Sequence, residues 1–333
     1  MHHAATTFQR KPSALRLVST KVLSRDNWLA VRRGGIGSSD AAAAIGLNPY
    51  QSQLALWMIK TGRDANFPKV DPNDETSPMY WGTLLEPIVA THYSRRTGNR
   101  VRKVNAVLQH PDPDKAWMLA NIDREVIGTA DVQILECKTA GEFGARLWRD
   151  GVPEYVICQV QHQLAVTGKA AADVCVLLCG QEIQVHRIER DEVLIAGLIA
   201  LERRFWQYVE SDTPPPADGS DSAEIALRCL YPADAGQCLD LTDDRDLSHT
   251  FADLVRVRQE IADRQEREAQ LKQQIQQRMG DASTAVFETG RVSWKKAKDS
   301  QALDLDALLL DQPDLSARYA LTKPGSRRFI VTT

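Results

Sequence analysis

Apolar residues recur at helical spacing in four segments of the N-terminal two thirds of the chain, and a glycine or a polar turn follows most of them. Spacing of three and four residues places apolar side chains on one face of a helix. The pattern therefore predicts helices at 53–61, 78–97, 154–167 and 191–210. A shorter helix is expected to begin at Ser39, with that serine as its N-cap, and to end at Gly46.

Between these helices the chain changes to short runs rich in β-branched and apolar residues, which are typical of strands. Such runs lie at 100–108, 116–121, 132–138, 174–178 and 183–188. The order is helix, three strands, helix, two strands, helix. This order predicts an α/β (α+β) sandwich in which helices flank a mixed central sheet.

The character of the chain changes at Thr213–Pro216, where three consecutive prolines follow the last of these helices. A polar, acidic stretch comes next. We therefore divide the chain into a domain, a linker and a C-terminal region. Their expected bounds are 1–212 for the domain, 213–246 for the acidic, proline-containing linker and 247–333 for the C-terminal region.

The C-terminal region is expected to hold a long helix and a small β-containing appendage. Two strands, in FETGRVSWKK and RRFIVTT, are expected around a short helix at 302–310. The long helix has apolar residues at heptad positions, but Arg264, Glu268 and Arg278 interrupt them. It is therefore a weak coiled coil at best and needs a surface to pack on.

Composition narrows the class of protein. The 333 residues are 43% hydrophobic and 26% charged, values typical of a soluble globular protein, and no apolar run approaches the ~20 residues of a membrane span. Six cysteines lack paired CxxC spacing, so we expect reduced thiols in a cytoplasmic protein and no iron–sulfur cluster. A net charge of −3 disfavours a general nucleic-acid coat protein but not an enzyme with a local basic groove.

The stretch NIDREVIGTADVQILECK (121–138) carries the strongest chemical signal. Residues i and i+2 of a strand share a face, so Glu136 and Lys138 point the same way. A tight connection can bring Asp123 beside them. By itself this pattern is more often a solvated strand face, because alternating charges are common on exposed strands.

Two carboxylates and an ammonium suit metal-assisted phosphodiester hydrolysis. Mg²⁺ prefers hard oxygen ligands, retains several waters and needs only one or two protein carboxylates. The ion polarises phosphate and lowers the pKa of a bound water. Lys138 can orient or deprotonate that water, and the backbone carbonyl of Cys137 can face the metal as a third protein ligand.

The segments around this stretch resemble the YqaJ-type viral recombinase nucleases. These enzymes belong to the PD-(D/E)XK superfamily and are relatives of phage lambda exonuclease. Five segments match in the family's order, over about 30–210. They are RRGGIGSSDAAAAIGLNPY (32–50), WGTLLEPIVATHYSRRTG (81–98), MLANIDREVIG (118–128), LECKTA (135–140) and CQVQHQLAVTG (158–168).

The resemblance implies roles for individual residues. It places Glu86, Asp123 and Glu136 at a metal site, Lys138 as the catalytic lysine and Gln161 as the support of the lysine or the scissile phosphate. It also implies that Arg32 and Ser39 hold the terminal phosphate of a DNA strand. The alternatives are a plain N-cap for Ser39, a solvated charge for Arg32 and a buried hydrogen-bond partner for Gln161. The chain departs from the family pattern at Asn121, Arg124 and Gln163.

The resemblance further implies a Mg²⁺-dependent exonuclease, with Mn²⁺ as a substitute, that digests double-stranded DNA ends in a phage or prophage recombination system. The resulting single strands would pass to a single-strand-annealing partner protein. Homo-oligomeric rings, such as a trimer enclosing DNA, are expected by the same analogy, and no membrane partner is expected. An endonuclease of the same fold and a catalytically silent DNA-binding or assembly module are the alternative functions.

Overall fold

The computed structural model describes residues 14–69, 71–323 and 325–332 of the chain. The chain forms two compact units, Met1–Tyr231 and Pro232–Thr333. The first contains both sheets described below and every residue assigned to chemistry.

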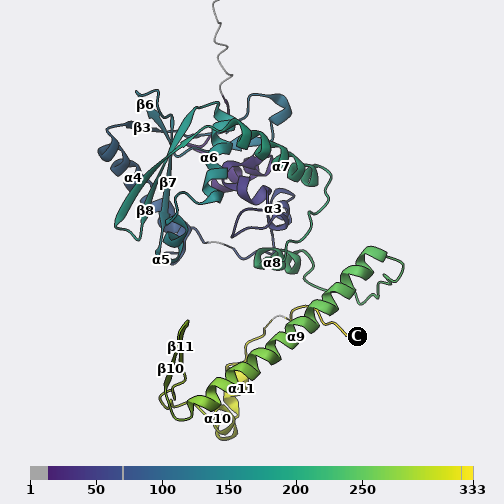
Figure 1. Ribbon diagram of the computed structural model, residues 1–333. Helices are drawn as coiled ribbons and strands as arrows, with labels where there is room; N and C mark the ends of the chain where they lie inside the picture. Colours follow the sequence, from purple (N-terminus) through teal and green to yellow (C-terminus); the bar gives the residue numbers. More distant parts are fainter. Residues whose placement is uncertain (1–13, 70, 324, 333) are drawn as a thin grey trace, which may run out of the picture. The chain divides into compact units, whose positions relative to one another are not determined.

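A five-stranded mixed sheet is the centre of the first unit (Figure 1). Its strand order is β3-β6-β7-β8-β9. Only β7 and β8 run parallel, and the other pairs are antiparallel. Helix α6 makes the crossover between the two parallel strands. The strands are β3 (Arg100–Lys103), β6 (Arg124–Ile127), β7 (Ile134–Ala140), β8 (Ala171–Leu178) and β9 (Glu182–Glu189).

A second sheet of four strands, in the order β1-β4-β5-β2, lies in the same unit. Its strands are β1 (Leu15–Ser19), β2 (Ile36–Gly37), β4 (Ala106–Gln109) and β5 (Met118–Ala120). The helices of the unit are α1 (Arg25–Arg33), α2 (Ala41–Ala44), α3 (Gln53–Lys60), α4 (Pro78–Thr97), α5 (Glu142–Ala145), α6 (Glu154–Thr167), α7 (Glu192–Glu210) and α8 (Asp221–Leu230). Short 3-10 turns are η1 (Ser38–Asp40), η2 (Pro113–Lys115) and η3 (Arg146–Trp148).

The five-stranded sheet is covered by a helix on each face, because successive strand residues point to opposite sides. Leu135 and Cys175 pack with Val89 and Tyr93 of α4 on one face. Ile134, Val174 and Val176 join the main hydrophobic core on the other face, where α6 lies. Glu136 and Lys138 lie two and four residues after Ile134, so their side chains point to the same side of the sheet as Ile134. They therefore belong to the face that α6 covers.

The predicted mixed α/β core with flanking helices is confirmed. Helices α4 and α6 have the bounds that their apolar spacing and closing glycines predict, and Gly98 and Gly168 follow them in the left-handed conformation that glycine favours. The stretch 100–108 divides into β3 and β4, which belong to different sheets. Residues 124–127, which lie between two of the predicted strands, form the additional strand β6 and pair with β7.

Helix α8 belongs to the first unit, although the segment 213–246 was expected to be a linker. Its small residues Ala223 and Ala226 are buried, and the Ser222 hydroxyl accepts a hydrogen bond of 2.9 Å from the backbone N–H of Ser52. The sequence signal was weak because only two alanines of the helix are buried.

The second unit consists of a long helix, a hairpin and two short helices. They are α9 (Arg245–Met279), β10 (Thr284–Phe287), β11 (Gly290–Ser293), α10 (Leu305–Asp311) and α11 (Asp314–Arg318). The strand expected in RRFIVTT does not form over 327–332, and Thr333 lies outside the described residues. Within the described ranges, none of the helices combines the length and apolarity that crossing a membrane requires.

Candidate functional site

Two glutamines of α6 reach across to the charged residues of β7. Lys138 Nζ donates to Glu136 Oε1 at 2.8 Å and to Gln159 Oε1 at 2.8 Å. Gln159 Nε2 donates to Glu136 Oε1 at 2.6 Å, and Gln163 Nε2 donates to Glu136 Oε2 at 2.8 Å. The lysine and the carboxylate are thus fixed from the helix side. A buried carboxylate has about four acceptor positions, and three are used here.

Asp123 comes directly before β6 and lies beside β7. Its Oδ2 accepts a hydrogen bond of 2.8 Å from the backbone N–H of Cys137. Burial, together with the charge of Glu136, raises the pKa of Asp123 to about 8, although Lys138 and the Cys137 N–H act to lower it. Two carboxylates therefore lie close together, and the positive charge around them is too small to favour the ionised form of Asp123.

Lys138 remains a cation in this setting. Burial alone would lower the pKa of Lys138, but Glu136 and Asp123 outweigh that effect and raise it. An ammonium group has three N–H donors, and two of them are committed to Glu136 and Gln159. The third is available to an anionic group that approaches the site.

Gln161, which the resemblance placed at the lysine, is turned away from it. Its Nε2 donates to the Glu189 carbonyl at 2.8 Å, and its Oε1 accepts from the Asp191 N–H at 3.1 Å. Helix geometry explains the difference. Residues 159 and 163 are four apart and share a face, whereas 161 lies on nearly the opposite side. Gln159 therefore occupies the place expected for Gln161.

Glu86 of α4 lies near the site but is held by a different cation. Arg124 Nη1 donates to Glu86 Oε1 at 2.5 Å and to the Asp123 carbonyl at 2.7 Å. Arg124 is one of the positions at which the chain departs from the pattern of the family that it resembles. The arginine thus links the acidic helix residue to the strand that carries Asp123.

The donor set fits a hard divalent cation with few protein ligands. Among the residues that the structure describes, no three His, Cys, Asp or Glu side chains gather closely enough to hold a metal by themselves. Asp123 and Glu136 supply two carboxylates. The Cys137 N–H faces Asp123, and the N–H and C=O of one strand residue point to the same edge, so its carbonyl faces that side too. Mg²⁺ suits such a set because it keeps several waters.

Arg32 and Ser39 form a second polar group, with partners that the sequence did not single out. Arg32 Nη2 donates to Ser39 Oγ at 2.7 Å and to Asp40 Oδ1 at 2.6 Å. Lys60 Nζ donates to Asp40 Oδ2 at 2.7 Å. Despite its burial, these two cations hold the pKa of Asp40 well below its usual range. The group has two cations for one carboxylate and is therefore net positive.

Ser39 does not cap a helix. It lies within η1, and its hydroxyl accepts from Arg32, while α2 is only four residues long. Such a short helix has no useful dipole, so any anion site here depends on the side chains. Gly37 permits the close packing, because a Cβ at that position would lie 2.9 Å from Arg32 Nη2.

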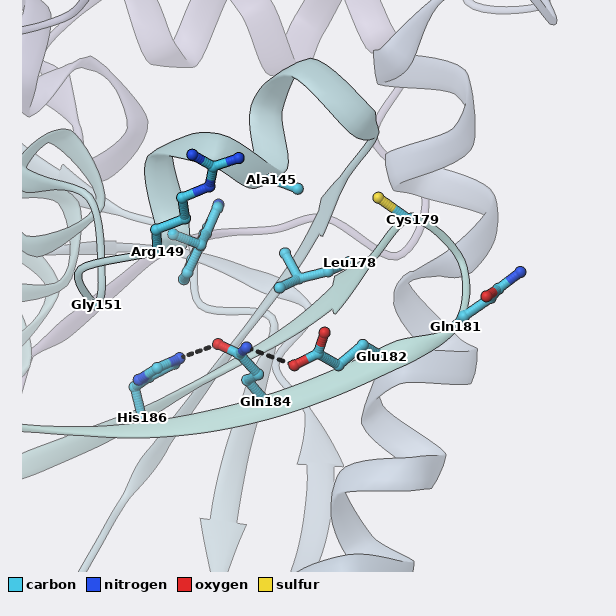
Figure 2. Close-up of a pocket in the computed structure, with 10 residues that line it drawn as sticks. Ala145, Arg149, Gly151, Leu178, Cys179, Gln181, Glu182, Gln184 and His186 are labelled. Atoms are coloured by element: carbon cyan, nitrogen blue, oxygen red, sulfur yellow. Dashed lines mark hydrogen bonds between the residues drawn. The ribbon is translucent and has the colours of Figure 1, made fainter.

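A cavity of about 410 Å³ lies between η3 and β9 (Figure 2). His186 Nε2 and Gln184 Oε1 are 3.0 Å apart, and Gln184 Nε2 donates to Glu182 Oε1 at 2.7 Å. None of the residues predicted to act in chemistry lines this cavity. It is therefore not the candidate site.

Several known proteins are similar to this chain. Residues 27–170 match the model of the YqaJ-like viral recombinase domain. The YqaJ protein of Bacillus subtilis (strain 168) is 34% identical over 304 residues, which are 90% of this chain and 92% of that protein. A protein of African swine fever virus is 26% identical over 186 residues, 49% of this chain and 51% of that protein. The structure of an alkaline exonuclease from Laribacter hongkongensis is 25% identical, covers 56% of this chain and 93% of that one, and has a TM-score of 0.46.

Proposed function

The chain belongs to the YqaJ-like viral recombinase family, and we propose that it is a metal-dependent deoxyribonuclease that hydrolyses phosphodiester bonds. One observation carries the proposal. Asp123, Glu136 and Lys138, which are separated along the chain, converge beside the middle of β7, and two glutamines of α6 hold the last two in place. A silent binding module has no need for two close carboxylates, one of which raises the pKa of the other.

Each residue has a distinct task. Asp123, Glu136 and the Cys137 carbonyl would hold Mg²⁺, or Mn²⁺ in its place, and Glu86 would reach the same ion only through solvent or by leaving Arg124. When bound, the ion supplies a Lewis acid for the phosphate and a more acidic water. Lys138 directs its third N–H at the phosphate or at the attacking water, where it offsets developing negative charge. Gln159 keeps the lysine in position, and Gln163 keeps Glu136 oriented.

We further propose that the enzyme acts on double-stranded DNA ends as an exonuclease. The net-positive group of Arg32, Ser39, Asp40 and Lys60 would receive a terminal phosphate, since guanidinium groups favour dianionic phosphate. By analogy with the family, we also propose a phage-type recombination role. It includes transfer of the single strand to an annealing protein, a ring such as a trimer and a cytoplasmic location in the bacterial host.

The test is a cleavage assay with end-labelled linear duplex and closed circular duplex, each with EDTA, Mg²⁺, Mn²⁺ or Ca²⁺. We expect cleavage of linear DNA with Mg²⁺ or Mn²⁺ only, and faster cleavage when the 5′ ends carry phosphate. Equal cleavage of circles would point to an endonuclease instead. Binding without cleavage under every metal condition would refute the nuclease.

A further inference from the structure

The face of α6 that fixes the catalytic residues continues toward solvent as a row of side chains four residues apart. Gln163 is fully buried, Gln159 is partly buried, and Tyr155 follows one turn nearer the helix N-terminus. One helical turn advances about 5.4 Å. Tyr155 therefore lies immediately outside the Glu136–Lys138 pair on the same wall of the site.

Tyr155 is extended outward by a second aromatic ring from another segment. The ring of Tyr50 meets the Tyr155 ring edge to face, with centroids 6.0 Å apart and planes at 85°. Such T-shaped pairs are favourable aromatic arrangements. The Tyr50 side of the pair is open to solvent, because 66% of that residue is exposed.

Hydrogen bonds to the Asn48 side chain hold the loop that carries Tyr50 in place. Asn48 Oδ1 accepts hydrogen bonds from the Tyr50 N–H at 2.8 Å and from the Gln51 N–H at 3.2 Å. Ser52 then caps α3. An exposed aromatic ring on a fixed loop loses little conformational entropy when it binds a flat partner.

The spacing suits a nucleotide next to the cleaved bond. From the Gln159–Lys138 hydrogen bond, one helical turn leads to Tyr155 and one ring contact of 6.0 Å leads to Tyr50. The Tyr50 ring thus lies beyond Tyr155 at the outer end of this row of side chains, farther from the lysine than Tyr155 is. No charged group is needed for such a contact, because every base has a π-face that can stack on an aromatic ring.

We propose that Tyr50, backed by Tyr155, is a stacking subsite for the nucleobase adjoining the scissile phosphate. The inference rests on the proposed nuclease function and adds a binding residue to it. Stacking would fix the frayed nucleotide while Lys138 contacts its phosphate. Because stacking is tolerant of sequence, the subsite would act on all four bases.

Cleavage of matched substrates tests the subsite. Wild type, Tyr50→Ala, Tyr50→Phe and the same-loop control Leu47→Ala, whose residue is also exposed, are compared on linear duplexes. The duplexes carry normal nucleotides or one abasic nucleotide at the first, second or third position from the end. We expect Tyr50→Ala to lower kcat/KM about tenfold on normal DNA, the lower part of the range for losing one base–aromatic stack. Tyr50→Phe and Leu47→Ala should stay near wild type.

The abasic series separates stacking from general damage. At one abasic position the difference between wild type and Tyr50→Ala should vanish, because the ring has no base to contact. An unchanged ratio at every position, or a Tyr50→Ala variant equal to wild type on normal DNA, would overturn the proposal.

A binding readout separates this inference from the nuclease proposal. DNA with 2-aminopurine at the sensitive position is titrated in EDTA, where no cleavage occurs. We expect wild type to quench its fluorescence and Tyr50→Ala to quench it less. Equal quenching by both proteins would count against the subsite. Quenching that depends on Tyr50, in a protein that never cleaves DNA, would support the subsite while refuting the nuclease.

Discussion

Helices α6 and α9 both carry many polar residues, but α6 is largely buried and α9 is exposed. Ten of the 14 residues of α6 are buried, and its buried glutamines and histidine all have partners. Helix α9 has 35 residues, and none of them is buried. Its apolar residues Val257, Ile261 and Leu271 are each more than 40% exposed.

The contrast shows where polar side chains are specified by the fold and where they are only solvated. On α6 most of the buried polar groups are matched, with Gln163 Oε1 as an exception, because an unpaired buried group costs about 1–3 kcal/mol. Because Gln159 and Gln163 of α6 form hydrogen bonds with Glu136 and Lys138, these two charged residues are held in place. On α9 the ion pairs, such as Glu268 with Lys272, are exposed and constrain nothing else. Substitutions of the same type should therefore have unequal effects in the two helices.

The largest effect is expected at the buried pair of His162 and Glu202. His162 Nδ1 lies 2.7 Å from Glu202 Oε1, and both side chains are inaccessible to solvent. Removing one partner of such a pair typically costs 3–5 kcal/mol. We expect Glu202→Ala to lower the free energy of unfolding by about that amount in urea titrations. The control is Glu260→Ala in α9, whose exposed partner Arg256 lies 3.7 Å away and for which we expect a change below about 0.5 kcal/mol.

The same pair predicts how stability depends on pH. Burial acts to lower the pKa of His162, but Glu202, the Leu119 carbonyl and Asp40 outweigh it and raise the pKa above the usual 6.5. The folded state thus binds the proton more tightly than the unfolded state. This contribution is complete below pH 6.5 and is lost as the pH rises through the raised value. We expect the free energy of unfolding of Glu202→Gln to fall less than that of wild type as the pH rises. If the variant showed the same pH dependence as wild type, the effect could not be assigned to the His162–Glu202 pair.

The next effect concerns catalysis by the Glu–Lys pair of β7. We expect Glu136→Gln or Lys138→Met to lower the cleavage rate by about 10²-fold or more, the scale for losing a group that stabilises transition-state charge. The matched pair in α9, Glu268→Gln and Lys272→Met, has a similar N–O distance of 2.7 Å but is exposed, so its rate should not change. Initial rates on linear duplex, with circular dichroism as a check on folding, decide the matter. Wild-type rates from either β7 variant would remove the central proposal.

How far the sequence predicted this arrangement depends on the range of the interactions. Helices α4 and α6 follow from apolar spacing and glycine ends, which are local signals. That Glu136 and Lys138 point the same way was predicted from the alternation of side chains along a strand, and that Asp123 lies beside them was predicted from a tight connection between strands. The contact of Lys138 with Gln159, in place of Gln161, was not predicted, because it depends on which face of α6 meets β7 in three dimensions.

The partners of Arg32 could not be predicted from the local sequence either. Asp40 and Lys60 lie 20 residues apart in sequence and meet only when α3 packs beside η1. The alanine-rich run after Asp40 predicts burial but gives no indication that a charge pair lies beneath it. Pairing of buried charges is a tertiary property, and a single sequence carries no direct signal for it.

A smaller effect should distinguish the two glutamines of α6. Gln159→Ala removes the acceptor for Lys138 and one donor to Glu136, so we expect a loss of about tenfold in kcat with little change in stability. Gln161→Ala breaks the bonds to the Glu189 carbonyl and the Asp191 N–H. It should cost about 1–3 kcal/mol of stability and leave kcat near wild type at low temperature. The reverse result would restore the role that the family resemblance gave to Gln161.

The smallest effect on the nuclease unit is expected from removing the region with α9. The cut must follow Tyr231 and not Asp212, because Ala223 and Ala226 of α8 are buried and Ser222 is bonded to Ser52. We propose that the chain 1–231 keeps metal-dependent cleavage of short duplex and loses less than about 0.5 kcal/mol of stability, whereas a chain ending at Asp212 exposes the α3 surface and is less stable. The apolar stripe of α9 would then serve contacts between subunits or with a recombination partner. Light scattering should show a smaller assembly for 1–231 than for the full chain, and Ile261→Asp in the full chain should have the same effect. A folded 1–231 protein without detectable cleavage would instead show that the C-terminal region completes the active site.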